Sequence, residues 1–167
     1  MMTTQGKLFF GAGFETTSSC LTTFCYNLAL NVDIQEKLHE EILEIVADGE
    51  IDNENIKDMH YLEAAILENL RICPPVITQE RICKKDAEVK GLKIKKGTYM
   101  KMAIYAAQHD EEFFPEPKKF KPERFLKENA ETLIPYTFLA FSGGPRVCLG
   151  QRFAMTEMKV SCLFTFF

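Results

Sequence analysis

The sequence predicts a mainly α-helical fold with a small β region near its middle. Apolar residues recur at helical spacing in three segments, at about 8–31, 35–46 and 60–72. Between about 76 and 104 short apolar runs alternate with turn residues such as Gly91, a pattern typical of strands. A chain of 167 residues with 46% hydrophobic and 26% charged residues is large enough to form one domain with a core.

The helical segments have recognisable starts and ends. The first, Leu8–Asn31, is mostly apolar, so we expect a buried helix with a bend at Gly11 and Gly13. Asp33, followed by Glu36, fits a capping box loosely and predicts the start of the second helix. A pair of prolines ends the third.

The β region and the C-terminal part follow from turn signals. Gly91 predicts a hairpin over Val89–Ile94. Residues 76–77 and 81–83 predict a strand before it, and residues 98–104 predict another strand after it. A loop rich in proline and charge runs from about 110 to 127. A final helix is expected to begin near Gly150.

Composition narrows the function classes. The net charge is −4, the isoelectric point is about 5.5, and the basic residues are dispersed, so nucleic acid is not an expected partner. The sequence begins without a signal-peptide pattern and has no uninterrupted apolar run long enough to span a membrane. It ends within an apolar stretch, Ser-Cys-Leu-Phe-Thr-Phe-Phe, from which we expect a truncated piece of a larger protein.

Six cysteines are present, and their spacing matches neither a CxxC pair nor a zinc site. Most are expected to be small buried apolar residues. One of them, Cys148, has distinctive neighbours. The six are Cys20, Cys25, Cys73, Cys83, Cys148 and Cys162.

Cys148 lies in a glycine-rich segment, residues 141–150, immediately before the final helix. Adjacent glycines and a proline predict a tight backbone path. A cysteine at a helix start, with Arg146 nearby, is in surroundings that favour the thiolate. These residues by themselves allow a structural turn, a nucleophilic cysteine or a metal-ligand loop. The nucleophile lacks a partner base that the sequence places beside it.

The same segment resembles the haem-binding signature of cytochromes P-450, Phe-x-x-Gly-x-Arg-x-Cys-x-Gly. Its five specified positions are occupied by Phe141, Gly144, Arg146, Cys148 and Gly150. The resemblance implies that the Cys148 thiolate is the axial ligand of the iron in haem b. It also implies that Arg146 pairs with a haem propionate and that Phe141 packs near the sulfur.

Two further motifs strengthen the resemblance. Taken alone, Glu68 and Arg71 are an ordinary i,i+3 pair on a helix. The family, however, has a Glu-x-x-Arg motif in such a helix and a Pro-Glu-Arg-Phe element downstream, here Pro122–Phe125. The resemblance therefore implies that Glu68, Arg71 and Arg124 form a buried structural network behind the cysteine segment.

The first helix carries a third motif, Ala12–Thr17. Without context it is a helix interior with one exposed acid. The resemblance implies that Thr16 hydrogen-bonds to bound oxygen or a water and that Glu15 helps to relay protons. It also implies that Arg81 is a second partner of the haem propionates and that Val76 and the residue after it line the substrate pocket.

The sequence departs from the family pattern at two positions. Gln108 stands where many relatives carry histidine, and Glu111 stands where many carry proline. These departures affect the expected shape of one loop and a possible haem contact, but they do not affect the iron ligand.

The motifs occur in family order, so the resemblance covers residues 1–167 as a single partial domain. That domain is the C-terminal haem-binding portion of the fold, from the helix I-like to the helix L-like segment. The implied function is a monooxygenase that activates O2 to oxidise a small lipophilic substrate, with electrons from NADPH through NADPH-cytochrome P-450 reductase. The sequence of residues 80–86 resembles that of the microsomal drug-metabolising branch of the family. This implies the cytosolic face of the endoplasmic reticulum membrane, reached through an anchor outside this chain.

Two other functions remain open at this point. The chain could be a truncated product that is unstable, does not hold haem and has no activity. Alternatively, it could belong to a family member that rearranges or dehydrates its substrate without external oxygen. The presence of Glu15 and Thr16 favours the monooxygenase, because that pair serves the protonation of oxygen.

Overall fold

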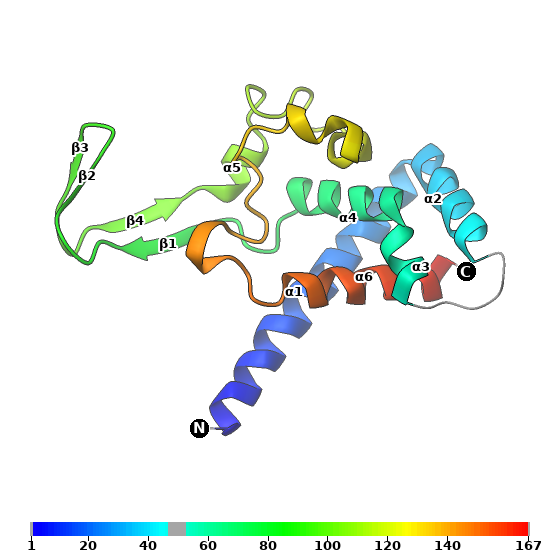
Figure 1. Cartoon of the computed structure of the whole chain (residues 1–167), viewed down its shortest axis with the longest axis horizontal. Coiled ribbons are helices and arrows are strands. Elements are labelled where there is room, and N and C mark those ends of the chain that lie inside the picture. Colours follow the sequence, from blue (N-terminus) through cyan, green and yellow to red (C-terminus); the bar gives the residue numbers. More distant parts are fainter. Residues whose placement is uncertain (1, 47–52, 167) are drawn as a thin grey trace.

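The computed structural model describes residues 2–46 and 53–166. Helices form the body of the molecule, and two small antiparallel sheets extend from one end of it (Figure 1). The prediction of a mainly α fold with a small β region is therefore confirmed.

Four helices pack around the core. The apolar side chains that meet there include Phe24, Leu28, Leu62 and Leu163, all at most 1% exposed. A short helix, α3, packs against the last of the four. The helices are α1 (Met2–Leu30), α2 (Val32–Ile45), α3 (Asn53–Asp58), α4 (His60–Ile72) and α6 (Gln151–Phe166).

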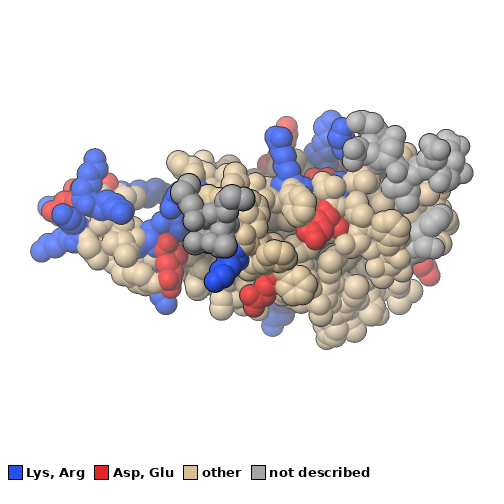
Figure 2. Space-filling view, turned by 90° about the horizontal axis from the view of Figure 1, so that it is seen from below, with Lys and Arg blue, Asp and Glu red and all other residues tan. Residues whose placement is uncertain are grey.

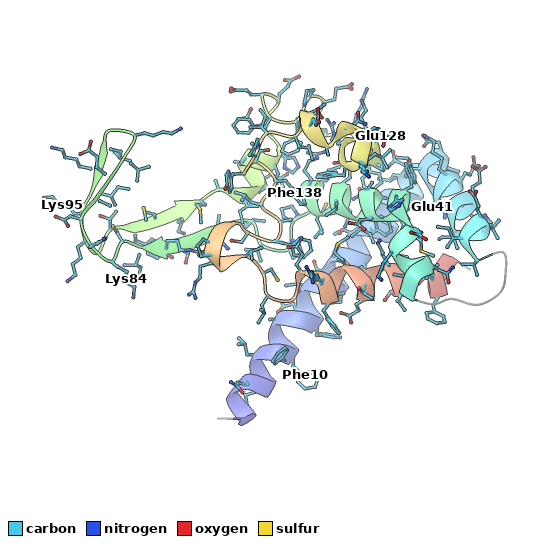
Figure 3. The ribbon with its side chains drawn as sticks, viewed as in Figure 1. Phe10, Glu41, Lys84, Lys95, Glu128 and Phe138 are labelled. Atoms are coloured by element: carbon cyan, nitrogen blue, oxygen red, sulfur yellow. The ribbon has the colours of Figure 1, made fainter. Side chains whose placement is uncertain are left out.

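Helix α1 differs from its prediction in length and burial. It begins at Met2 and runs without interruption through Gly11 and Gly13. Its first half is exposed rather than buried: Phe10 is 80% and Phe14 75% exposed. The physical reason is visible in Figures 1 and 3, where α1 extends beyond α4 and α6, leaving Phe10 far from the body.

The start of α2 also corrects the sequence prediction. Asn31 is the N-cap, without a side-chain capping bond, and Asp33 already lies in the first helical turn. The predicted capping box is therefore wrong, although the position of Asp33 still suits the helix dipole. A carboxylate of α2 instead serves α4, because Glu41 accepts hydrogen bonds from the backbone N–H groups of Tyr61 (2.7 Å) and Leu62 (2.8 Å).

The β region consists of two hairpin-like pairs. In the outer pair Lys90 and Gly91 form the turn, both with positive φ (48° and 81°), as a two-residue hairpin requires. Figure 2 shows lysine and arginine side chains gathered at this end of the molecule. The strands are β1 (Gln79–Ile82), paired with β4 (Tyr99–Met102), and β2 (Ala87–Val89), paired with β3 (Leu92–Ile94).

Two strand boundaries differ from those expected. Residues 76–77 are not in a strand, and Ile104 begins a helix, α5 (Ile104–Gln108), rather than ending a strand. The backbone N–H of Tyr105 donates to the carbonyl of Ile77 (3.1 Å). This tertiary bond joins the start of α5 to residues that the apolar pattern assigns to a strand.

The proline-rich segment is irregular but ordered against the body. Three 3-10 turns follow one another along it and beyond: η1 (Pro122–Phe125), η2 (Lys127–Thr132) and η3 (Gly144–Arg146). The first packs against α4 and brings Arg124 to that helix. Across residues 2–46 and 53–166, no helix has the length and apolar character needed to cross a membrane.

Candidate functional site

Cys148 lies on the surface at the end of segment 141–150, which we call the cysteine segment. Its backbone N–H donates to the carbonyl of Phe141 (2.8 Å), and its own carbonyl accepts from Gln151 (3.4 Å), the first residue of α6. The side chain is exposed, and the flanking Val147 and Leu149 are 48% and 98% exposed. The thiol therefore projects from a tight backbone loop among exposed apolar groups.

The sequence of this segment explains its backbone path. Gly144 has a φ of 68°, a conformation that glycine adopts at little cost. Ser142 has a φ of 65°, which costs a non-glycine residue about 1 kcal/mol. Its hydroxyl donates to the side-chain oxygen of Gln79 (2.8 Å), which fixes it to β1, while Phe141 packs against the core.

Two arginines belong to the cysteine segment or to the strand that it contacts. Arg146 is exposed within it, and Arg81 lies on β1, where it is half-buried like Gln79 two residues earlier. Because alternate residues of a strand share a face, Arg81 lies on the side of β1 that contacts Ser142. Arg81 donates to the carbonyl of Glu80 (2.8 Å). Neither guanidinium forms an ion pair with a carboxylate in the described part of the chain.

Behind the segment lies a buried charge network. Arg71 and Glu68 are both 0% exposed and form a two-pronged pair, Nε to Oε2 at 2.7 Å and Nη2 to Oε1 at 2.9 Å. Arg124 adds a contact to Glu68 Oε1 at 3.3 Å. Arg71 also donates to the carbonyls of Gln108 (2.7 Å) and Pro117 (2.8 Å). Such bidentate, fully partnered burial is what makes an ion pair tolerable inside a protein.

The sequence does not single out Gln108 as a bonded core residue. Its side chain is 0% exposed and donates to the carbonyls of Leu70 (3.2 Å) and Arg71 (3.0 Å). Its side-chain oxygen accepts from the backbone N–H of Leu139 (2.9 Å). Gln108, a residue that departs from the family pattern, is therefore one of the residues that hold the chain leading into the cysteine segment. The sequence signal was a polar residue in an otherwise apolar run, which is too weak to predict a role.

The structure does not bring the proposed proton-relay pair into contact with the cysteine segment. Glu15 is exposed on α1, and the hydroxyl of Thr16 donates to the carbonyl of Ala12 (2.7 Å) within the helix. Thr17, the next residue, is buried with its hydroxyl unpartnered among the described residues. The two motifs remain on separate elements, α1 and the approach to α6.

Buried thiols elsewhere contrast with Cys148. Burial raises the pKa of Cys20 from 9.0 to about 11 and that of Cys162 from 9.0 to about 12. A raised pKa disfavours the thiolate, the form that reacts and binds metals. Most cysteines were predicted to be buried, but the structure buries these two and leaves Cys25 exposed like Cys148.

Comparison with known proteins gives a consistent result. A family model described as Cytochrome P450 matches residues 2–165. Cytochrome P450 3A16 of Mus musculus is 42% identical over 163 residues, which is 97% of this chain and 32% of the relative. Cytochrome P450 3A29 of Sus scrofa is 41% identical over 158 residues (94% and 31%). Cytochrome P450 3A2 of Rattus norvegicus is 43% identical over 163 residues (94% and 31%). The chain thus spans about a third of the length of the curated relatives it matches.

Proposed function

Because this chain belongs to the cytochrome P450 family, we propose that it forms the haem-binding part of a haem-thiolate monooxygenase. In this proposal Cys148 is the axial ligand of the iron. The observation that supports it most is the exposed thiol of Cys148 on a segment anchored from behind. Phe141 packs against the core and Ser142 bonds to β1, so the sulfur is presented outward by a fixed backbone.

The surroundings of Cys148 fit haem b. A haem has a flat apolar ring and two propionate groups, so it requires apolar contacts around the ligand and cations at its edge. Val147 and Leu149, the chain neighbours of Cys148, and Phe153 in the first turn of α6 supply exposed apolar surface. Arg81 and Arg146 supply guanidinium groups that lack a carboxylate partner in the described residues, and arginine matches a carboxylate in two-pronged geometry.

When bound, the iron would supply oxygen activation, with thiolate donation favouring cleavage of the O–O bond. The role of the chain is to hold the sulfur, to limit water around it and to deliver protons. Phe141 covers the inner side of the cysteine segment. Fewer water molecules around the sulfur would change the reduction potential of the metal that the sulfur binds. Glu15 and Thr16 are adjacent on α1, where a carboxylate and a hydroxyl could pass protons to the reaction.

The remaining parts of the function follow from family membership and stay proposals. The substrate is a small lipophilic molecule, with Val76 and Ile77, both exposed and apolar, at its pocket. Electrons come from NADPH through NADPH-cytochrome P-450 reductase. The protein acts on the cytosolic face of the endoplasmic reticulum membrane, held there by an anchor outside this chain.

A haem titration tests the proposed site. We expect Arg81→Ala and Arg146→Ala each to weaken haem binding by about tenfold, because each loses a charge-assisted bond to a propionate. Arg152→Ala, an exposed arginine on α6, serves as the matched control and should leave the affinity unchanged. Equal affinities for all four proteins would contradict the assignment of the propionate partners. An unchanged chain that binds no haem would favour the inactive-fragment alternative.

A further inference from the structure

We propose that Gln108 is a positioning residue that holds the cysteine segment at a fixed place against the end of α4. Its amide uses every strong hydrogen-bonding group it has. Both N–H groups are directed to carbonyls, those of Leu70 (3.2 Å) and Arg71 (3.0 Å), and the oxygen accepts from Leu139 (2.9 Å). A fully buried amide with three partners on two separate segments is a bridge between them.

On the α4 side, Gln108 completes the end of a helix. The last turn of a helix leaves carbonyl groups without an intrahelical partner, and α4 ends at Ile72. Leu70 and Arg71 carry two of the carbonyls in that turn, and Gln108 satisfies both. Arg71 returns the contact, because its guanidinium donates to the backbone carbonyl of Gln108 (2.7 Å). The side chain of each residue thus bonds to the backbone of the other.

On the other side, the bridge reaches the cysteine segment through two more bonds. Leu139, whose N–H bonds to Gln108, accepts at its carbonyl from Ser142 (2.8 Å). Phe141 then accepts from the N–H of Cys148 (2.8 Å). The buried charge pair of α4 is therefore connected to the backbone of Cys148 through hydrogen bonds and the peptide bond between Phe141 and Ser142, and the Gln108 side chain spans the gap between the two elements.

A second anchor makes the role of Gln108 separable from general folding. Ser142 is also held by Gln79 of β1, an element separate from α4. Loss of the Gln108 amide should therefore free one side of the segment while the strand contact and the α1–α2–α4 core remain. An apolar residue at position 108 would remove the partner of three backbone groups, two of them buried, at the cost typical of unsatisfied groups.

Site-resolved hydrogen exchange of the full chain without haem tests this proposal. We expect Gln108→Leu to speed exchange of the Leu139, Ser142 and Cys148 amides by about tenfold or more, the effect of losing one hydrogen bond. Amides of α2 such as Ile42 should not change. Gln35→Leu, an exposed glutamine on α2, is the matched control and should have no effect on the cysteine segment.

A second variant distinguishes bonding from packing. Histidine is a planar side chain of similar reach, and at about pH 8 its neutral ring has one donor and one acceptor. Gln108→His should therefore recover most of the protection that Gln108→Leu loses. Exchange rates in Gln108→Leu equal to those of the unchanged chain would overturn the proposal. It would also be overturned by acceleration spread uniformly over α2 and α4, or by no recovery in Gln108→His.

The consequence for iron rests on the proposed function. In the haem-loaded protein, Gln108→Leu should give two absorption bands in the reduced, carbon monoxide-bound state, one of the thiolate type and one of the thiol type. The reason is that the backbone of Cys148 is no longer held in one position. If haem-loaded Gln108→Leu gives only the thiolate-type band, the proposed effect of Gln108 on iron ligation is wrong. Absence of the thiolate band from the unchanged protein would sink the proposed function, whereas the exchange result would still decide the role of Gln108.

Discussion

At the scale of single residues, exposure to solvent separates Cys148 from the core cysteines. Cys20 and Cys162 are 2% exposed, and burial raises the pKa of both thiols. Cys148 stands on the surface with its backbone N–H bonded to Phe141. Chemical reactivity should follow this difference, since a thiol must be both accessible and ionised to react.

Alkylation of the native chain measures that difference. At about pH 8, we expect Cys148 to be labelled by iodoacetamide long before Cys20 and Cys162, with mass spectrometry identifying the sites. Cys25, exposed on α1, provides an accessible reference. In urea all four should react alike. Early labelling of Cys162 in the native chain would show that the α1–α4–α6 core is open.

At the scale of elements, α4 is the support on which the site depends. Its N-terminus is capped by Glu41 from α2, and its C-terminal half carries Glu68 and Arg71. Arg71 contacts two segments outside α4 through its guanidinium, as the bonds to Gln108 and Pro117 show. Helix α4 therefore joins the core to α5, to η1 and to the loop that contains Pro117.

Truncation of Arg71 should be severe. Arg71→Ala removes the bidentate cation from the buried Glu68 carboxylate, and breaking a buried ion pair by removing one partner costs about 3–5 kcal/mol in the free energy of unfolding. Urea denaturation followed by circular dichroism measures the loss. Lys37→Ala, which removes the exposed pair with Glu123, is the control and should change stability little. An equally small effect of Arg71→Ala on the free energy of unfolding would contradict the proposed contribution of this network to stability.

The sequence predicts the helices and strands whose ends are set by local turn residues. It does not predict the element ends that are set by tertiary contacts. The hairpin around Gly91 and the helix ending before Pro74 follow from turn chemistry, and both are present. The strand expected to reach Ile104 instead gives way to α5, because the Tyr105 N–H bonds to Ile77 across the fold. Propensity cannot anticipate a bond of that kind.

The candidate site likewise has some features that the sequence predicts and others that depend on tertiary contacts. The glycine and arginine spacing of the cysteine segment can be recognised from sequence, because a backbone with positive φ at Gly144 requires glycine. The meeting of Glu68, Arg71 and Arg124 was expected from the family resemblance rather than from spacing. The amide of Gln108 could not be predicted, because its partners are backbone groups of residues far away in the chain.

At the scale of the whole molecule, the core formed by α1, α2, α4 and α6 contains two buried thiols that make it sensitive to alkali. Between pH 9.0 and about 11 to 12, the unfolded chain ionises Cys20 and Cys162 while the folded chain keeps them neutral. The stability they contribute is therefore intact below pH 9.0 and is lost as the pH rises through the folded values.

The alkaline loss is measurable by variant comparison. We expect the urea midpoint of the chain to fall between about pH 8 and pH 11, and Cys162→Ala to reduce that fall. Tyr61, whose pKa is also raised by burial and by Glu123, contributes equally to both proteins and cancels in the comparison. Parallel pH profiles for the two proteins would show that Cys162 does not carry the effect.

The most direct measurement is the absorption of the reduced, carbon monoxide-bound chain after loading with haem. Thiolate ligation by Cys148 predicts a long-wavelength Soret band that disappears in Cys148→Ala and persists in Cys25→Ala, which changes an exposed cysteine on α1. Persistence of the band in Cys148→Ala, or haem binding by the unchanged chain without that band, would contradict the assignment of Cys148 as the iron ligand.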